Sequence, residues 1–551
     1  MHRCRPGPTS PNVGAVGVPL EESYWPADPS VEVRDLTVGA LLREAAAAAP
    51  DGPALVEGTV DRDSRRRWTY AELLADSEGM ARGLLSRFRP GERVAVWAPN
   101  TAEWLLLEYG AGLAGIVLVT VNPAYRPKEL AWVLGQSGAS GIVMVPDYRG
   151  SPMRAFLEEV RPDLPQLRDV ILWDELPELV ADPPATPLPT VAPTDPAQIQ
   201  YTSGTTGFPK GALLHHRGIV NNSNMYTSRL EVGEGDVYLN PMPLFHTGGC
   251  VQGALGCLWR RAVHVLVSPG FDSALMVDLV EQERVNVIVG VPTMLIAMIE
   301  RPDFAQRDLS SATTALSGGS TVPPELVRRI ERELGVRFGI VYGQTEASPV
   351  ITQTRLDDTI EDKAETVGQP LPQVEVEVID PATGEIVPTG AVGELCARGY
   401  QVMTGYYEMP DKTAETIDAD GWLHTGDLAT MDERGYLRIV GRLRDMIIRG
   451  GENIYPREIE DVLFTHPGVA EAAVVGIPDP RWGEVVGAFI RPVAGAEPTE
   501  QDLFAHVRAH LAPHKTPTVW RFVEAYPLTP SGKIKKYELV EQYHLEMTGS
   551  G

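Results

Sequence analysis

The chain has 551 residues, of which 43% are hydrophobic and 22% charged, so its composition is that of a folded protein, not a disordered one. A formal net charge of −26 argues against non-specific binding to nucleic acid or an anionic membrane, whose phosphates would repel it. The four cysteines are scattered and form no CxxC pair, so we expect neither a disulfide framework nor a structural zinc site. We find no secretory signal and no apolar run of about 18 residues, and we predict a cytoplasmic protein without stable membrane insertion.

Residues 1–25 are rich in proline, glycine and serine and are predicted to form a loose N-terminal arm. From residue 37 onwards, short apolar strands alternate with longer segments of helical period. The predicted strands are 93–98, 115–121 and 141–145, with helices at 101–113 and 127–134. After a proline-rich connector at 183–193 the pattern resumes with strands at 263–267, 285–291, 313–316 and 337–342. Such alternation predicts an α/β fold whose largely parallel sheet is covered by helices on both faces.

The pattern changes near residue 367. Segments 374–379, 393–397 and 436–440 alternate with a period of two, which predicts a small antiparallel sheet or a β-barrel-like subdomain at 367–441. A third pattern follows residue 441, with helices at 456–464 and 501–511 and strands at 472–475, 486–490 and 520–523. We therefore predict a large domain at 26–441 and a small C-terminal α+β domain at 445–551.

Residues 197–212 read AQIQYTSGTTGFPKGA and predict an anion-binding loop after a strand. Its glycines let backbone N–H groups converge on an anion, its hydroxyls add donors, and its lysine adds a point charge suited to phosphate. It is not a Walker A loop, because the lysine is followed by glycine instead of serine or threonine. A polar turn is the alternative. The candidate residues are Thr202, Ser203, Gly204, Thr205, Thr206, Gly207 and Lys210.

This string resembles the phosphate loop of the adenylate-forming superfamily, which includes acyl-CoA synthetases, luciferases and the adenylation domains of peptide synthetases. Five further segments that resemble motifs of the superfamily follow in order, and the resemblance covers nearly the whole chain. They are SGGS at 317–320, YGQTE at 342–346, WLHTGD at 422–427, GRLRDMIIRGG at 441–451 and PSGK at 530–533. Among these enzymes the chain looks most like bacterial medium-chain fatty acyl-CoA synthetases.

The resemblance implies a nucleotide site. Gly318, Gly319 and Ser320 would flank the adenine, and the ring of Tyr342, with Gly343 and Gln344 beside it, would stack on it. Thr345 would contact the α-phosphate, Glu346 would hold Mg²⁺, and Asp427 and Arg442 would bind the ribose. Taken alone, each residue also has a structural interpretation: a core tyrosine, a solvated loop acid, an Asx turn and an arginine in an ion pair.

The resemblance also implies a mobile C-terminal domain. Lys533 would reach the reacting carboxylate and phosphate, and Thr205 of the loop would assist. Arg444 aligns with the hinge, where the family more often has Asp or Lys. After the domain rotates, Gly450 and Gly451 would let the backbone approach the pantetheine arm of CoA, although an ordinary turn explains them too.

The residues that would bind the acyl group are less clearly indicated by the sequence than those that would bind the nucleotide. His246 of PLFHTGG would border the acyl pocket and gate the thiol path, or it could be a core histidine. The small residues after it predict a deep apolar pocket, lined also by Val291, Met294 and Ser317; these small residues are Gly248, Gly249, Gly253, Ala254 and Gly256. Asp272 in GFDSA resembles an amino-acid recognition motif, but it lies one element too late for that role.

Together these features predict a carboxylic acid–CoA ligase that uses ATP, Mg²⁺ and CoA and acts on a medium-chain fatty or bulky apolar acid. An acyl-AMP ligase that loads a carrier-protein phosphopantetheine is the alternative, although such ligases usually carry an insertion that we do not see. A non-catalytic nucleotide-binding protein is disfavoured, because Lys210, Glu346 and Lys533 are all present. No heptad pattern indicates a coiled coil, and the sequence leaves the oligomeric state open, with a homodimer as one option.

Overall fold

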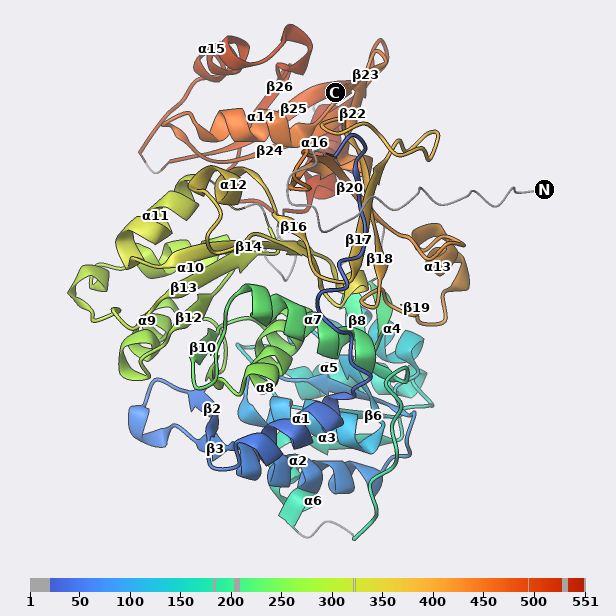
Figure 1. Cartoon of the computed structure of the whole chain (residues 1–551). Coiled ribbons are helices and arrows are strands. Elements are labelled where there is room, and N and C mark those ends of the chain that lie inside the picture. Colours follow the sequence, from blue (N-terminus) through green and yellow to red (C-terminus); the bar gives the residue numbers. More distant parts are fainter. Residues whose placement is uncertain are drawn as a thin grey trace.

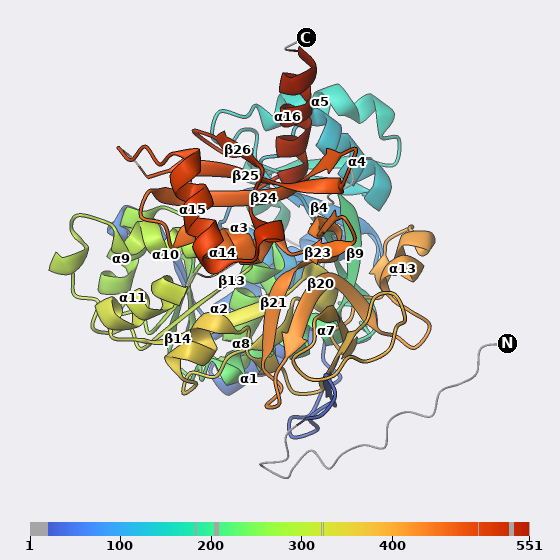
Figure 2. The same cartoon turned by 90° about the horizontal axis from the view of Figure 1, so that it is seen from above.

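The computed structural model describes residues 20–181, 185–202, 209–320, 322, 324–493, 495–527 and 534–549. These residues form four sheets, three of which belong to the large domain and one to the C-terminal domain (Figures 1 and 2). The predicted α/β class is confirmed. Within the described part of the chain, no helix is both long and apolar enough to cross a bilayer.

The first sheet has the strand order β19-β9-β8-β5-β4-β6-β7. The five strands from β8 to β7 are parallel, and β9 and β19 add antiparallel strands at one edge. Val94 and Val96 pack in one core cluster while Ala95 and Trp97 pack in another, so both faces are covered by helices as predicted. The strands are β4 Arg93–Trp97, β5 Val117–Thr120, β6 Gly141–Met144, β7 Asp169–Leu172, β8 Pro196–Thr202, β9 Lys210–His215 and β19 Gly405–Tyr406.

Six helices accompany this sheet, and their ends follow local sequence signals. Thr69 and Glu72 form a capping box at the start of α2, and Gly115 ends α3 in the left-handed conformation at φ 66°. Proline occupies the first turn of α4, where its missing N–H costs nothing. The helices are α1 Val38–Ala48, α2 Tyr70–Leu85, α3 Ala102–Ala114, α4 Pro127–Ser137, α5 Met153–Val160 and α6 Leu176–Ala181.

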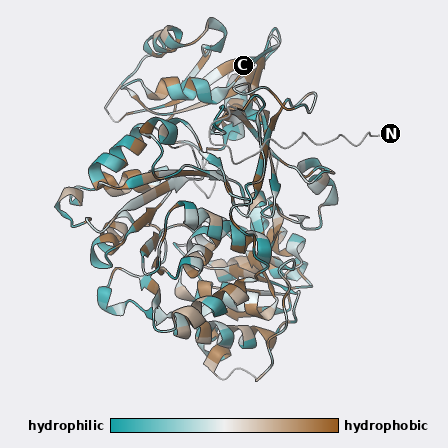
Figure 3. Ribbon diagram, viewed as in Figure 1, coloured by the Kyte–Doolittle hydropathy of each residue, from teal (hydrophilic) through white to brown (hydrophobic). Residues whose placement is uncertain are grey.

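The second sheet has nine strands in the order β16-β15-β14-β13-β12-β10-β11-β2-β3. Its inner strands are parallel, and antiparallel pairs lie at its two ends. The strands are β2 Pro53–Gly58, β3 Arg67–Thr69, β10 Val237–Asn240, β11 Val263–Val267, β12 Val287–Val289, β13 Thr314–Gly318, β14 Arg337–Gly343, β15 Val350–Gln353 and β16 Gln369–Pro370. The accompanying helices are α7 His216–Arg229, the π-helix η4 Gly248–Leu255, α8 Gly256–Arg260, α9 Ser273–Gln282, α10 Pro292–Ile299, α11 Pro324–Leu334 and α12 Ile360–Glu365. Hydrophobic residues gather on the inner strands of these sheets (Figure 3).

The third sheet is antiparallel, in the order β1-β17-β18-β20-β21. The predicted β-barrel-like closure is absent from the described residues, in which β1 and β21 stay at opposite edges of an open sheet. The loose arm predicted at 1–25 is also corrected at its end, because Tyr24 and Trp25 pair with β17. The elements are β1 Tyr24–Trp25, β17 Val374–Ile379, β18 Gly393–Gly399, α13 Pro410–Thr416, β20 Leu423–Met431 and β21 Leu437–Arg442.

The C-terminal domain has its own sheet and its own core clusters, as an independent domain requires. The short 3-10 helix η7 Leu443–Asp445 links it to β21. Strands β22 Ile447–Arg449, β23 Glu452–Ile454, β24 Val469–Asp479, β25 Gly483–Pro492 and β26 Val519–Phe522 are accompanied by helices α14 Pro456–Phe464, α15 Glu500–His510 and α16 Lys536–Gly549.

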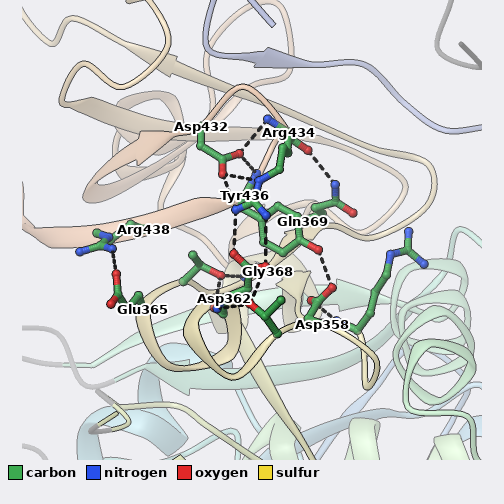
Figure 4. Close-up of polar contacts among 12 residues, drawn as sticks. Asp358, Asp362, Glu365, Gly368, Gln369, Asp432, Arg434, Tyr436 and Arg438 are labelled. Carbon is green, nitrogen blue, oxygen red and sulfur yellow. Dashed lines mark hydrogen bonds and ion pairs between the residues drawn. The ribbon is translucent and has the colours of Figure 1, made fainter. Parts of the chain in front are cut away.

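A polar network joins the second and third sheets (Figure 4). Arg434, in the turn between β20 and β21, contacts Asp362 of α12 at 2.7 Å and Asp432 at 2.8 Å. Its carbonyl oxygen accepts the Gln369 side-chain N–H at 2.7 Å, and the Tyr436 hydroxyl donates to Asp358. The arginine holds the pKa of Asp362 below its usual range. The network therefore fixes the third sheet, which carries part of the site described below, against the second.

We expect Arg434→Gln to lower the free energy of unfolding of the large domain by about 1 kcal/mol, the upper range for exposed pairs, because the arginine serves two carboxylates. Thermal unfolding at low salt measures the effect. The difference from the unsubstituted protein should shrink in about 1 M NaCl, where charges are screened within about 3 Å. An unchanged midpoint at low salt would show that the network adds no stability.

Candidate active site

Three predicted nucleoside-binding residues meet although they lie far apart in the sequence. The Tyr342 hydroxyl donates to Asp427 Oδ2 at 2.7 Å, and Arg442 Nε lies 3.2 Å from Asp427 Oδ1. The pairing of β20 with β21 sets Asp427 directly opposite Arg442. A register shift at the end of β14, where a side chain on Gly343 would collide with the carbonyl of Pro349, sets the position of Tyr342.

The side chains of Tyr342, Asp427 and Arg442 are suited to binding a diol, such as the two hydroxyls of a ribose. Asp427 is 8% exposed, and each of its oxygens already has one donor, so its charge is held in place and its remaining lone pairs can accept hydroxyl donors. Burial, and then the nearby Asp427 charge, raises the pKa of Tyr342, so the phenol stays protonated and donates. The structural interpretation of Arg442 as an ion-pair residue is therefore correct, and its partner is Asp427.

A second group links Lys210 to Glu346 through a residue that the sequence analysis did not select. The Tyr406 hydroxyl donates to Glu346 Oε1 at 2.6 Å, and Lys210 Nζ lies 4.0 Å from the centre of the Tyr406 ring. Lys210 is on β9 and Tyr406 is on β19, which pairs with β9. No local pattern distinguishes Tyr406 from its neighbour Tyr407, because only the strand pairing decides which one faces Lys210.

The second group combines the opposite charges of Lys210 and Glu346 at a site that is partly shielded from solvent. Burial lowers the pKa of Lys210, while the Glu346 charge opposes that shift. Glu346 is 8% exposed and sits in the short 3-10 helix η6 Thr345–Ala347, directly after Gln344. One carboxylate fits Mg²⁺, which takes one or two carboxylates together with substrate phosphates and water.

The SGGS segment forms the turn at the end of β13. A side chain on Gly318 would collide with Val341 of the paired strand β14, and Gly319 has φ 76°, so both glycines are required by the backbone. A Cβ on Gly319 would lie 3.8 Å from Val291 at the start of α10, which places the predicted adenine turn beside the predicted acyl residues. Ser317 is buried, and its hydroxyl has no hydrogen-bond partner among the described residues. Ser320 is exposed.

The surroundings of the residues predicted to line the acyl pocket differ in part from the prediction. His246 is half-buried, and its Nδ1 accepts the N–H of Gly248 at 3.1 Å, at the entrance to the π-helix η4. The predicted space beside the small residues is filled: a Cβ on Gly249, Gly253 or Gly256 would collide with Pro243, Asn240 or Thr227, respectively. These glycines allow close packing and do not leave a pocket. Val291, the residue before α10, and Met294, on α10, are half-buried, and Asp272 caps α9 by accepting the N–H groups of Ala274 and Leu275.

The predicted hinge residue lies between β21 and β22, and the predicted CoA residues lie between β22 and β23. Arg444 is in η7, where burial and the charge of Arg442 lower its pKa. Gly450 and Gly451 form the two-residue turn between β22 and β23, with φ values of 61° and 90°. Such a turn requires positive φ at both positions, so the hairpin alone explains both glycines.

Six predicted residues lie outside the described part of the chain: Ser203, Gly204, Thr205, Thr206, Gly207 and Lys533. The residues that flank the predicted phosphate loop are described: β8 ends at Thr202, and β9 starts at Lys210, which pairs with Thr202. Lys210 is therefore the first residue of the strand that follows the predicted loop.

Comparisons with known proteins show the family of the chain. The model of the AMP-binding enzyme family matches residues 42–407, and the model of the AMP-binding enzyme C-terminal domain matches residues 458–533. YngI of Bacillus subtilis, a proposed acyl-CoA synthetase, is 40% identical over 92% of this chain and 97% of its own length. The mitochondrial medium-chain acyl-CoA ligase ACSF2 of Rattus norvegicus is 40% identical over 93% of this chain and 88% of its own.

A solved structure shows the same fold. ATP-bound MatB from Rhodopseudomonas palustris superposes with a TM-score of 0.84 and 29% identity, covering 92% of this chain and 99% of MatB. The chain belongs to the AMP-binding enzyme family, whose acyl-CoA synthetases it resembles over nearly its whole length.

Proposed function

We propose that the chain is an ATP-dependent carboxylic acid–CoA ligase. A carboxylate attacks the α-phosphorus of ATP and pyrophosphate leaves, giving an acyl adenylate; the thiol of CoA then attacks the acyl carbon and AMP leaves. The observation that carries the proposal is the pair of residue groups, one suited to a ribose and one that joins a lysine to a buried carboxylate beside the phosphate loop. The similarity to acyl-CoA synthetases supports the same chemistry.

Each group has a distinct task in this scheme. Asp427 accepts the ribose hydroxyls while Tyr342 and Arg442 hold it, and the Tyr342 ring stacks on the adenine. Lys210 faces the phosphates, and Tyr406 fixes the rotamer of Glu346. Mg²⁺, when held by Glu346 and the phosphates, neutralises charge on the reacting anions. Alignment and charge neutralisation dominate because both reactants are anions.

The acyl substrate is proposed to be a medium-chain fatty or bulky apolar acid. Support comes from the half-buried Val291 and Met294 next to the adenine turn and from the name of the ACSF2 relative. His246 is proposed to border the thiol path. Arg444 as a hinge and the Gly450–Gly451 turn as a CoA contact remain predictions, as do a homodimer and a cytoplasmic location.

Product analysis tests the proposal. The purified protein is incubated with ATP, Mg²⁺, CoA and a mixed pool of fatty, aryl and alicyclic acids, and the products are identified by mass spectrometry. Acyl-CoA and AMP are expected, and the acyl mass identifies the substrate class. Acyl-AMP that accumulates without a thioester would contradict CoA as the acceptor and favour a carrier protein.

We expect Asp427→Asn to raise the KM for ATP by about 10- to 100-fold, since hydrogen bonds to a charged group contribute about 1.5–3 kcal/mol each. Asparagine keeps one acceptor oxygen and the size of the side chain, so the fold should persist. A matched control is Asp420→Asn, at an exposed position near the start of the same strand. An unchanged KM for both ATP and dATP would contradict ribose binding by Asp427.

A further inference from the structure

A side-chain cluster outside the two residue groups contains a glutamate, a cysteine and a histidine. Glu394 and Cys396 lie on β18, and His424 lies on β20 directly opposite Cys396. Residues two apart on a strand share a face, so the pairing of β18 with β20 puts all three side chains together. Their ligand atoms lie within 4.8 Å of one another. These two strands run side by side in Figure 1.

The distances match those between ligands of one small cation. Cys396 Sγ lies 3.5 Å from His424 Nδ1, and Nδ1 lies 3.1 Å from Glu394 Oε2. Tetrahedral zinc, with bonds of about 2.3 Å to sulfur and about 2.0–2.1 Å to nitrogen and oxygen, sets its ligand atoms about 3.3–3.6 Å apart. Little movement is therefore needed to surround an ion.

A single hydrogen bond of His424 Nδ1 accounts for only one of its two close contacts in the cluster. A histidine Nδ1 has either one hydrogen or one lone pair, so it can make a single well-directed hydrogen bond. Here the same nitrogen faces both a thiol and a carboxylate oxygen. The donor set of imidazole, thiolate and carboxylate suits zinc, which accepts all three ligand types.

The surroundings resemble those of metal ligands in proteins. His424 Nε2, on the far side of the ring, lies 3.7 Å from Asp418 Oδ2, and ligating histidines usually donate this second N–H to a carboxylate. Asp418 is itself fixed, because its Oδ1 accepts the N–H groups of Asp420 and Trp422 at 2.9 Å each. Cys396 is fully buried, while the His424 side chain is 30% exposed, so the cluster is enclosed on one side and open to solvent on the other.

We propose that Glu394, Cys396 and His424 bind one Zn²⁺, with water as the fourth ligand and Asp418 as the residue that orients the histidine. Binding replaces the thiol proton of Cys396, which is released to solvent. Glu394 Oε1 accepts the N–H of Gly426 at 3.1 Å, next to Asp427. The ion would therefore also hold the turn that positions the Asp427 carboxylate.

The test uses the full-length protein after removal of metal with a chelator. Cobalt(II) is titrated in as a spectroscopic probe, since a thiolate ligand gives a thiolate-to-cobalt charge-transfer band in the near ultraviolet. We expect this band to saturate at about one equivalent and to disappear when about one equivalent of Zn²⁺ is added. A protein without the band at any cobalt concentration would overturn the proposal.

Variants locate the site. Cys396→Ser and His424→Gln should both lose the band, whereas Cys4→Ala should keep it. The half-exposed His424 can be replaced without filling or emptying the core, and circular dichroism confirms that each variant is folded. Asp418→Asn keeps the acceptor for Trp422 but not the one for Nε2, and it should weaken zinc binding by about 10- to 100-fold. A band that persists in both folded ligand variants would overturn the site.

Discussion

Replacing Lys533 with alanine is expected to slow adenylate formation by about 100- to 1000-fold while ATP binding changes little, since a cation that contacts the reacting atoms acts mainly in the transition state. The family resemblance of the PSGK segment motivates this expectation. Single-turnover formation of acyl-AMP measures the rate, and equilibrium titration measures ATP binding. The conversion of supplied acyl-AMP to acyl-CoA should be retained, because the predicted domain rotation would take Lys533 away from the reacting atoms before that step.

Lys535 gives a matched control for Lys533. It lies two residues away, and its Nζ contacts Glu538 at 2.9 Å at the start of α16. Lys535→Ala should leave the adenylation rate within about twofold, as expected for a surface ion pair. Equal losses in the two variants would show that the effect comes from the stability of the C-terminal domain instead of a transition-state contact.

The second large effect is expected for Glu346→Gln. The change preserves shape but removes the charge that would hold Mg²⁺, and it should lower the adenylation rate by about 100- to 1000-fold with a higher requirement for Mg²⁺. Steady-state kinetics over a range of Mg²⁺ concentrations measure both. A variant with normal Mg²⁺ dependence would contradict the role of Glu346 as a ligand.

Tyr406→Phe should have a smaller effect on the same step, about 10-fold, because it removes one hydrogen bond to a carboxylate and leaves the carboxylate in place. As a positioning residue, Tyr406 should alter the Mg²⁺ dependence as well as the rate. Tyr407→Phe is the control, since Tyr407 is adjacent in sequence but its ring lies 5.8 Å from the guanidinium of Arg93 instead. An equal loss in both variants would contradict the positioning role.

Periodicity predicted the regular elements well. The strand at 374–379 and the helix at 456–464 have the predicted bounds, because the first five residues of one alternate in burial and the other starts at a proline. The N-terminal strand β1 was missed, since a two-residue strand has no period of its own and exists only through its pairing with β17. The closure of the third sheet could not be judged from the chain, because closure depends on the pairing of strands at opposite edges.

Site residues that belong to sequence motifs could be predicted from the sequence. Site residues that are brought together only by packing and strand pairing could not. Asp427 and Arg442 were selected from two separate motifs, and the structure joins them as strand partners. Tyr406 and the Glu394–Cys396–His424 cluster were missed, since each depends on cross-strand register that no local spacing encodes. The space predicted beside Gly249, Gly253 and Gly256 was misinterpreted, because a small residue in the sequence leaves open whether a ligand or another side chain fills the space.

The most direct test of adenylate formation is exchange of labelled pyrophosphate into ATP, measured without CoA. The scheme predicts exchange that depends on both Mg²⁺ and an added carboxylic acid, that is fastest with medium-chain or bulky apolar acids, and that is nearly lost in Lys533→Ala. ATP turnover that releases ADP and phosphate, without any acid-dependent exchange across the acid pool, would contradict it.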